Sequence, residues 1–206
     1  MGEIAENPKF SRKLAGILAA DIADYSALMS SDEARTVRDL KAHQAVVLPM
    51  IAEHSGRIID TAGDGILAEF ASVVNAVEFA VAIQKTMAER NTTVDPARRL
   101  QFRIGVNLGD VIHDDARVYD DGVNIAARLE AIAEPGGICL SGEASGRYKE
   151  DCRSPQSTSA TSSSRTLSSQ YVSTASTPHL HRALSRQDRH SAFPTSHRSP
   201  SFPSPT

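Results

Sequence analysis

One stretch of the chain alternates strictly between apolar and polar residues, and it constrains the fold more than any other feature. Its apolar members are Leu100, Phe102, Ile104 and Val106. A period of two predicts a half-buried β-strand. A shorter apolar run, Leu14 to Ala20, ends at Asp21 and predicts a strand buried on both faces that carries an acid at its tip. Such a short run also fits a buried helix segment, so periodicity alone leaves that alternative open.

Two segments before the alternating stretch have the apolar spacing of helices. Apolar residues at helical spacing predict a long amphipathic helix that begins near Asp32, with Ser30 and Glu33 as an S-x-x-E capping box. A second long helix is predicted to begin at Val73 and to end near Asn91.

A Gly-Asp-Gly turn and a terminal pair of elements complete the predicted order. Two apolar runs, 57–61 and 66–70, flank Ala62-Gly63-Asp64-Gly65 and predict a β-hairpin. A shorter helix is predicted over Val123 to Ala133 and a last strand over Ile138 to Ser141. The order β-α-β-β-α-β, followed by a helix and a strand, predicts an α+β fold of the ferredoxin-like sandwich type.

The chain changes character after about Arg147. From Cys152 to the end there are 16 serines, 7 threonines, 6 prolines and no glycine. Such a segment buries too little apolar area to offset its ordering entropy, so we expect disorder. The expected organisation is an N-terminal extension over residues 1–12, one folded domain over 13–147, and a disordered Ser/Thr/Pro/Arg-rich tail over 148–206.

Charge and cysteine content exclude several classes of function. Six arginines and one aspartate follow residue 151, so the last 55 residues carry +5 and the first 151 carry −8. An acidic body argues against nucleic acid as a partner. Cys139 and Cys152 are too few for a disulfide framework and match no metal motif. Glu3 and Glu6 stand where a signal peptide is basic, and no apolar run is long enough to span a bilayer, so we expect a cytoplasmic protein without a membrane partner.

Asp21 and Asp64 are the residues from which chemistry is most readily predicted. If their strands are neighbours, both carboxylates lie at one edge of the sheet. Hard oxygen ligands suit Mg²⁺ or Mn²⁺, and two such ions about 3.5 to 4 Å apart can clamp the attacking and leaving oxygens of a phosphoryl displacement. The alternative is structural, because Asp is common in D-G turns and as a helix cap.

Four segments resemble, in order, the motifs of the class III nucleotide cyclase catalytic domain. They are Leu18-Ala-Ala-Asp-Ile-Ala-Asp-Tyr-Ser26, Thr61-Ala-Gly-Asp-Gly65, Phe102-Arg-Ile-Gly-Val-Asn-Leu-Gly-Asp110 and Gly122-Val-Asn-Ile-Ala-Ala-Arg128. The resemblance implies a homodimeric adenylate or guanylate cyclase that converts ATP or GTP to a 3′,5′-cyclic nucleotide and pyrophosphate for intracellular signalling. It also implies the sandwich fold of that family and two Mg²⁺ or Mn²⁺ ions.

The resemblance implies a role for each matched residue. Asp21 and Asp64 would bind the metals, together with the backbone carbonyl of Ile22. Asn124 would orient the ribose and Arg128 would stabilise the transition state, both on a helix contributed by the partner subunit. Backbone N–H groups of the turn after the first strand would hold the phosphates if that turn has nest-like geometry, and they belong to Ile22, Ala23, Asp24 and Tyr25.

Two departures from the family pattern set the open questions. The positions that read the purine, commonly Lys and Asp or Thr, hold Asp60 and Arg117, which form either a swapped acid-base pair at the base or a plain surface pair. ATP and GTP therefore both remain candidates. Nothing after Arg147 resembles the final β-hairpin with its triphosphate lysine, as if the domain were truncated or frame-shifted. The alternative function is a degenerate cyclase-like module that dimerises or binds nucleotide without turnover.

Overall fold

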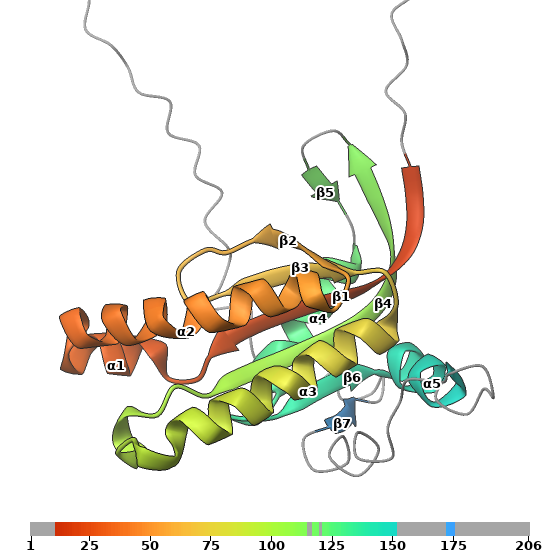
Figure 1. Cartoon of the computed structure of the whole chain (residues 1–206). Coiled ribbons are helices and arrows are strands. Elements are labelled where there is room, and N and C mark those ends of the chain that lie inside the picture. Colours follow the sequence, from red (N-terminus) through yellow and green to blue (C-terminus); the bar gives the residue numbers. More distant parts are fainter. Residues whose placement is uncertain (1–10, 115–116, 120, 152–171, 176–206) are drawn as a thin grey trace, which may run out of the picture.

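The computed structural model describes residues 11–114, 117–119, 121–151 and 172–175 (Figure 1). A seven-stranded sheet has the order β2-β3-β1-β4-β6-β7, and β5 pairs with β4 outside this path. Its strands are β1 (Ser11–Ile22), β2 (Gly56–Asp60), β3 (Ile66–Phe70), β4 (Phe102–Asp114), β5 (Arg117–Tyr119), β6 (Ile138–Ser141) and β7 (Val172–Ala175). The helices are α1 (Tyr25–Ser31), α2 (Glu33–Glu53), α3 (Val73–Arg90), α4 (Asp121–Ile132) and α5 (Gly142–Asp151), with 3-10 turns at Asn91–Thr93 and Pro96–Arg98. The α+β sandwich predicted from the sequence is confirmed.

The central strand, β1, lies antiparallel between β3 and β4. Its alternate side chains enter two apolar clusters, because successive residues of a strand point to opposite faces. Leu18, Ala20 and Ile22 belong to the cluster that includes α2 and α3, whereas Ile17 and Ala19 belong to the cluster that includes Ala126 of α4. The prediction of a strand buried on both faces is therefore confirmed, and the helix alternative is excluded.

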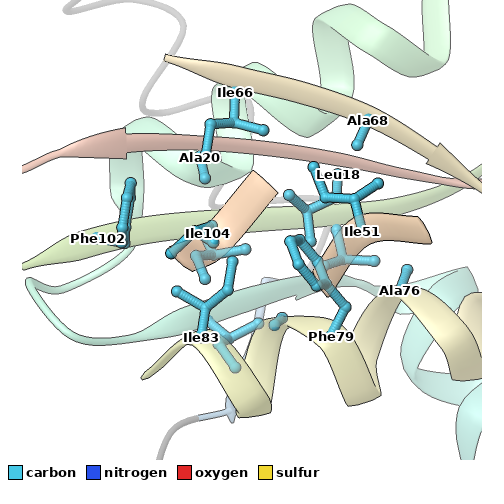
Figure 2. Close-up of a cluster of buried hydrophobic side chains, with 14 of the residues drawn as sticks. Leu18, Ala20, Ile51, Ile66, Ala68, Ala76, Phe79, Ile83, Phe102 and Ile104 are labelled. Atoms are coloured by element: carbon cyan, nitrogen blue, oxygen red, sulfur yellow. The ribbon is translucent and has the colours of Figure 1, made fainter. Parts of the chain in front are cut away.

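The larger cluster forms the core between the sheet and the helices α2 and α3 (Figure 2). Phe79 and Ile83 of α3 and Ile51 of α2 are almost completely buried there. The rings of Phe70 and Phe79 lie 5.1 Å apart between centroids, within the range of favourable aromatic pairs. This core fixes β1, which contains Asp21, and β3, which begins two residues after Asp64.

Helix α4 lies against the opposite face of the sheet, and its contact with β4 depends on Gly105. A Cβ atom at Gly105 would lie 2.1 Å from the carbonyl oxygen of Ala126 and 2.3 Å from the backbone nitrogen of Glu130. Only a residue without a side chain allows the helix to come this close. The position of α4 relative to β4 is thus set by backbone packing.

The start of α2 differs from the capping box that the sequence predicted. The N-cap is Asp32, whose side chain accepts a hydrogen bond from the N–H of Arg35 at 3.1 Å. Ser30 belongs to the separate short helix α1, and its hydroxyl donates to the carbonyl of Ser26 at 2.9 Å. The prediction of Ser30 as the cap is wrong because α1, which the sequence did not reveal, already contains this residue.

The predicted domain limits also need correction. Strand β1 begins at Ser11, inside the expected N-terminal extension, and helix α5 continues to Asp151, past the expected limit at Arg147. Strand β7 lies within the expected disordered tail and pairs in parallel with β6. Strand β6 pairs with β4 along one side and with β7 along the other. The prediction of a disordered tail is therefore wrong for residues 148–151 and 172–175, and the rest of the tail lies outside the described residues.

The chain after α5 and the apolarity of the helices concern two further sequence predictions. β7 is the only element described after α5, so the expected absence of a final β-hairpin stays a prediction. Among the helices that the structure describes, none combines the length and the apolarity needed to cross a membrane.

Candidate active site

Asp21 and Asp64 lie side by side at one edge of the sheet. The pairing of β1 with β3 brings Ala20 opposite Ile66, so the chain continues into Asp21 on one strand and into the hairpin turn on the other. One carboxylate oxygen of Asp64, Oδ2, accepts a hydrogen bond from the backbone N–H of Ile22 at 3.0 Å. The juxtaposition that the sequence predicted is therefore present.

The hairpin turn that carries Asp64 is fixed by two backbone features and one side-chain hydrogen bond. Gly63 has φ = +64°, a conformation that residues with a side chain rarely adopt. The N–H of Gly65 donates to the carbonyl of Ala62 at 3.0 Å, and the Nε2 amide of Gln44 on α2 donates to the carbonyl of Gly63 at 3.3 Å. These contacts direct the Asp64 carboxylate toward β1.

Arg103 closes the site from the side of β4. It lies opposite Asp21 in the β1–β4 register, and its guanidinium contacts both carboxylate oxygens, with Nε 2.9 Å from Oδ1 and Nη2 beside Oδ2. This fork is the strong, two-point form of an arginine–carboxylate pair. The hydrogen bond to Asp21 raises the pKa of Arg103 above its ordinary value, so the guanidinium stays charged.

Glu130 of α4 is the third acid at this edge. Its side chain is only 14% exposed, and Oε1 lies 3.6 Å from Nη2 of Arg103. Burial, and then the neighbouring charge of Asp21, raise the pKa of Glu130 to about 8. The two acids share a single guanidinium, so the ionised form of the more buried acid is the less favoured of the two.

The same electrostatics affects the other groups of the site. Burial raises the pKa of Asp64, and the hydrogen bond from Ile22 opposes that effect. Burial also raises the pKa of the Tyr25 phenol, with a further contribution from Asp64. The edge is thus poor in positive charge relative to its acids, a condition that favours a cation.

Two of the four backbone N–H groups that were predicted to hold phosphates already have protein acceptors in the structure. The N–H of Ile22 donates to Asp64 and that of Ala23 donates to the carbonyl of Gln101 at 2.9 Å. Asp24, with φ = 55°, precedes α1, so the N–H groups of Asp24 and Tyr25 stand where a helix begins and have no intrahelical acceptor. Of the four N–H groups predicted to hold phosphates, those of Asp24 and Tyr25 are therefore the ones available to a ligand.

Asn124 and Arg128 lie on the solvent-exposed face of α4. They are four residues apart and share that face, whereas Ala126 and Leu129 are buried against the sheet. The structure therefore brings Asn124 and Arg128 together, on the side of α4 away from the sheet that carries Asp21.

Asp60 and Arg117 remain without an observed relationship. Asp60 ends β2, and its Oδ1 accepts a hydrogen bond from the N–H of Thr61 at 2.8 Å. Arg117 begins β5 opposite Asp114, and its side chain lies outside the described part of the structure. Their role at the base stays a prediction.

The donor set at the sheet edge suits a magnesium-type ion. Asp21 and Asp64 offer carboxylate oxygens, and the carbonyl of Ile22 is adjacent. Within the described residues, no group of three or more His, Cys, Asp or Glu side chains could form a complete metal cage. Mg²⁺ usually binds through one or two carboxylates and completes its shell with water and substrate phosphates, so two aspartates fit it.

Comparison with known proteins decides the family. The sequence model of the "Adenylate and Guanylate cyclase catalytic domain" matches residues 10–166. This chain is a member of that family. A "Putative adenylate cyclase 3" of Rhizobium meliloti (strain 1021) is 49% identical over 131 residues, which are 63% of this chain and 22% of that protein. The cyclase domain therefore spans about a fifth of the length of this relative.

Solved structures of cyclases have the same fold. A crystal structure of an "Adenylate/Guanylate Cyclase/Hydrolase" from Silicibacter pomeroyi aligns with a TM-score of 0.65 and 40% identity, over 69% of this chain and 83% of that one. The guanylyl cyclase Cya2 aligns with a TM-score of 0.60 and 25% identity, over 68% of this chain and 80% of that one. The cyclase-type sandwich expected from the sequence is thus confirmed.

Two residues of the candidate site were missed by sequence reasoning. Arg103 is one of the regularly spaced polar residues of β4, so its sequence position gave no sign of a special role. Its pairing with Asp21 becomes evident only from the register of β1 and β4. Glu130 lies two residues after Arg128, and its burial required the docking of α4 at Gly105. The one available signal was a charged residue within a helix that is otherwise apolar on the sheet side.

Proposed function

We propose that this cyclase domain converts ATP or GTP to a 3′,5′-cyclic nucleotide and pyrophosphate with the help of two divalent cations. In this reaction the ribose 3′-oxygen forms a bond to the α-phosphorus, the bond from the α-phosphorus to the bridging oxygen breaks, and pyrophosphate leaves. The observation that carries the proposal is the hydrogen bond from Ile22 N–H to Asp64, which holds the second carboxylate beside the strand end that bears Asp21.

Asp21 and Asp64, with the carbonyl of Ile22, are the groups that would hold Mg²⁺ or Mn²⁺. When bound, such ions lower the pKa of the 3′-hydroxyl and stabilise the charge on the leaving pyrophosphate. The protein's own contribution is rigidity: β1 and β3 are buried on the core side, and the Gly63 turn is tied to α2 by Gln44. The carboxylates are therefore held in place before substrate arrives.

The proposal assigns the remaining chemistry to a second copy of the domain. Asn124 and Arg128 are exposed on α4, on the side away from the sheet that carries Asp21. A homodimer in which α4 of one copy faces the sheet edge of the other would bring Arg128 to the α-phosphate and Asn124 to the ribose. A guanidinium fork suits charge that develops on phosphate oxygens.

We propose ATP as the preferred substrate. The Rhizobium relative is named as an adenylate cyclase, and its 49% identity is the highest among the comparisons reported above. The Silicibacter structure is named for both activities, so GTP is the natural competitor in the same assay. Both nucleotides are held in the cytoplasm, where we expect the domain to act.

The proposal is tested by incubating purified protein with ATP or GTP and Mn²⁺, beside Asp21→Ala and Arg128→Ala, and measuring cyclic nucleotide by chromatography. Loss of one charge-stabilising group typically lowers the rate by about 10² to 10³, so both variants should be nearly inactive. Wild-type protein that makes no more product than these variants would show that the enzyme proposal is wrong.

A second candidate function is a cyclase-like module that binds nucleotide or dimerises without turnover. The observation that favours it is the Arg103 fork, which engages both oxygens of Asp21. If Arg103 keeps Asp21 from binding a cation, nucleotide would bind through other contacts and remain intact. Tight binding of ATP, measured by calorimetry, with no product and no dependence on Mn²⁺ would support this function over the first.

A further inference from the structure

We propose that Glu130 is a positioning residue that retains Arg103 beside the site when a divalent cation takes Asp21. This inference rests on the proposed function, because it assumes that Asp21 binds a cation. The carboxylate of Asp21 is fully engaged by Arg103, and a cation at Asp21 must displace at least part of that fork.

The geometry provides an alternative partner for the displaced guanidinium. Oε1 of Glu130 lies 3.6 Å from Nη2 of Arg103, the same nitrogen that contacts Asp21. A small movement of the arginine therefore exchanges one carboxylate for the other. Arg103 is 29% exposed at its side chain and Glu130 is 14% exposed, so the exchange takes place where a lone guanidinium is incompletely solvated.

The position of Glu130 is fixed by the fold. Arg103 and Gly105 are two residues apart on β4 and lie on the same face of the sheet. The backbone nitrogen of Glu130 packs over Gly105 so closely that a Cβ there would be 2.3 Å away. The acid is thus held next to Arg103 by contact between two backbones, and not by a flexible surface side chain.

A partner that waits beside the arginine lowers the cost of opening the metal site. Without it, a cation at Asp21 leaves the Arg103 guanidinium close to a second positive charge with no counter-ion, so Arg103 competes more strongly for Asp21. Glu130→Gln should therefore weaken the binding of Mn²⁺. The effect must pass through Arg103, and it should vanish when Arg103 is replaced.

The experiment is a double-mutant cycle on Mn²⁺ affinity, measured by electron paramagnetic resonance of free Mn²⁺ without nucleotide. We expect Glu130→Gln to weaken binding by roughly fivefold or more in the wild-type background, a typical coupling for contacting charged residues. In the Arg103→Gln background the same change should alter affinity by less than about twofold, since uncoupled substitutions act independently. Arg103→Gln alone should strengthen binding.

Two further variants test whether Glu130 must contact Arg103 and whether any acid near α4 has the same effect. Glu130→Asp keeps the carboxyl group but shortens the side chain, so it should weaken Mn²⁺ binding if contact with Arg103 matters and leave it unchanged if that contact does not matter. Glu134→Gln removes an acid from an exposed position shortly after α4 and should leave affinity unchanged. Thermal melts of all variants verify that they fold, and Glu130→Asp serves as the test if Glu130→Gln does not.

The outcomes distinguish this inference from the proposed function. Equal effects of Glu130→Gln in both backgrounds, with Mn²⁺ binding intact, would overturn the role of Glu130 and leave the cyclase proposal standing. Coupling through Arg103 in protein that makes no cyclic product would support the role of Glu130 and contradict turnover. Wild-type protein that binds Mn²⁺ no better than Asp21→Ala would overturn the role of Glu130 and also the metal site on which the proposed function depends.

Discussion

Arg103 of β4 lies directly across from Asp21 of β1, and its guanidinium engages both oxygens of the aspartate. Without a metal ion, the Arg103 guanidinium therefore occupies the place beside Asp21 that is proposed for a cation. The neighbouring acids, Asp64 and Glu130, both have raised pKa values because they are partly buried. A cation bound at this place would stabilise the ionised forms of these acids.

The first prediction concerns Asp64→Asn. An asparagine carbonyl can still accept the hydrogen bond from Ile22 N–H, so the turn should stay in place. Burial raises the pKa of Asp64, which means that its ionised form is disfavoured in the folded protein. At neutral pH the variant should therefore be at least as stable as wild type in urea denaturation, while Mn²⁺ affinity falls by more than roughly tenfold. A variant that loses stability but keeps Mn²⁺ affinity would contradict the proposed ligand role.

The second prediction is the pH dependence of stability in the metal-free protein. The pKa of Glu130 is raised from 4.5 to about 8 in the folded state, so the folded protein binds this proton more tightly than the unfolded chain does. Its contribution to the free energy of unfolding is complete below about pH 4.5 and is lost as the pH rises to about 8. Urea denaturation in EDTA should show a steeper decline over this range for wild type than for Glu130→Gln. Parallel curves would show that Glu130 does not titrate in this window.

The third prediction tests the docking of α4. Gly105→Ala places a methyl group against the backbone of Ala126 and Glu130 and should cost about 1 to 3 kcal/mol of stability. Gly146→Ala in α5 is the matched control, because a Cβ there meets nothing within 4 Å. It should increase stability by up to about 1 kcal/mol, since alanine is the better helix former. Similar effects at the two glycines would mean that α4 does not pack on Gly105 as described.

The fourth prediction tests the corrected helix cap. Asp32→Ala removes the acceptor for the Arg35 N–H and should cost about 1 kcal/mol. Ser30→Ala removes only an exposed hydroxyl within α1, and its effect should stay within about 0.5 kcal/mol. Urea denaturation of the two single variants compares their losses of stability. A larger loss for Ser30→Ala than for Asp32→Ala would support the capping box predicted from the sequence.

Much of the fold was predictable because its strands and helices have clear periods. The alternation around Phe102 and Ile104, the apolar run before Asp21, and the Gly-Asp-Gly turn each specify a local structure with little dependence on the rest of the chain. The juxtaposition of Asp21 and Asp64 follows from those elements once their strands are taken as neighbours.

The features that sequence reasoning missed depend on tertiary contacts. The Arg103–Asp21 pair needs the β1–β4 register, which no local pattern encodes. The burial of Glu130 needs a helix packed on a glycine. Strand β7 forms because β6 offers an edge, although its own segment is rich in polar residues.

The most direct test of the account mixes two inactive variants. Asp21→Ala lacks the metal-site acid and Arg128→Ala lacks the exposed arginine of α4, so neither homodimer has a complete site. Random exchange makes half of the dimers mixed, with one complete site in each, so cyclic product should return to about a quarter of the wild-type rate. A mixture that stays as inactive as its components, under conditions where the wild-type protein makes product, would contradict a site shared between two copies.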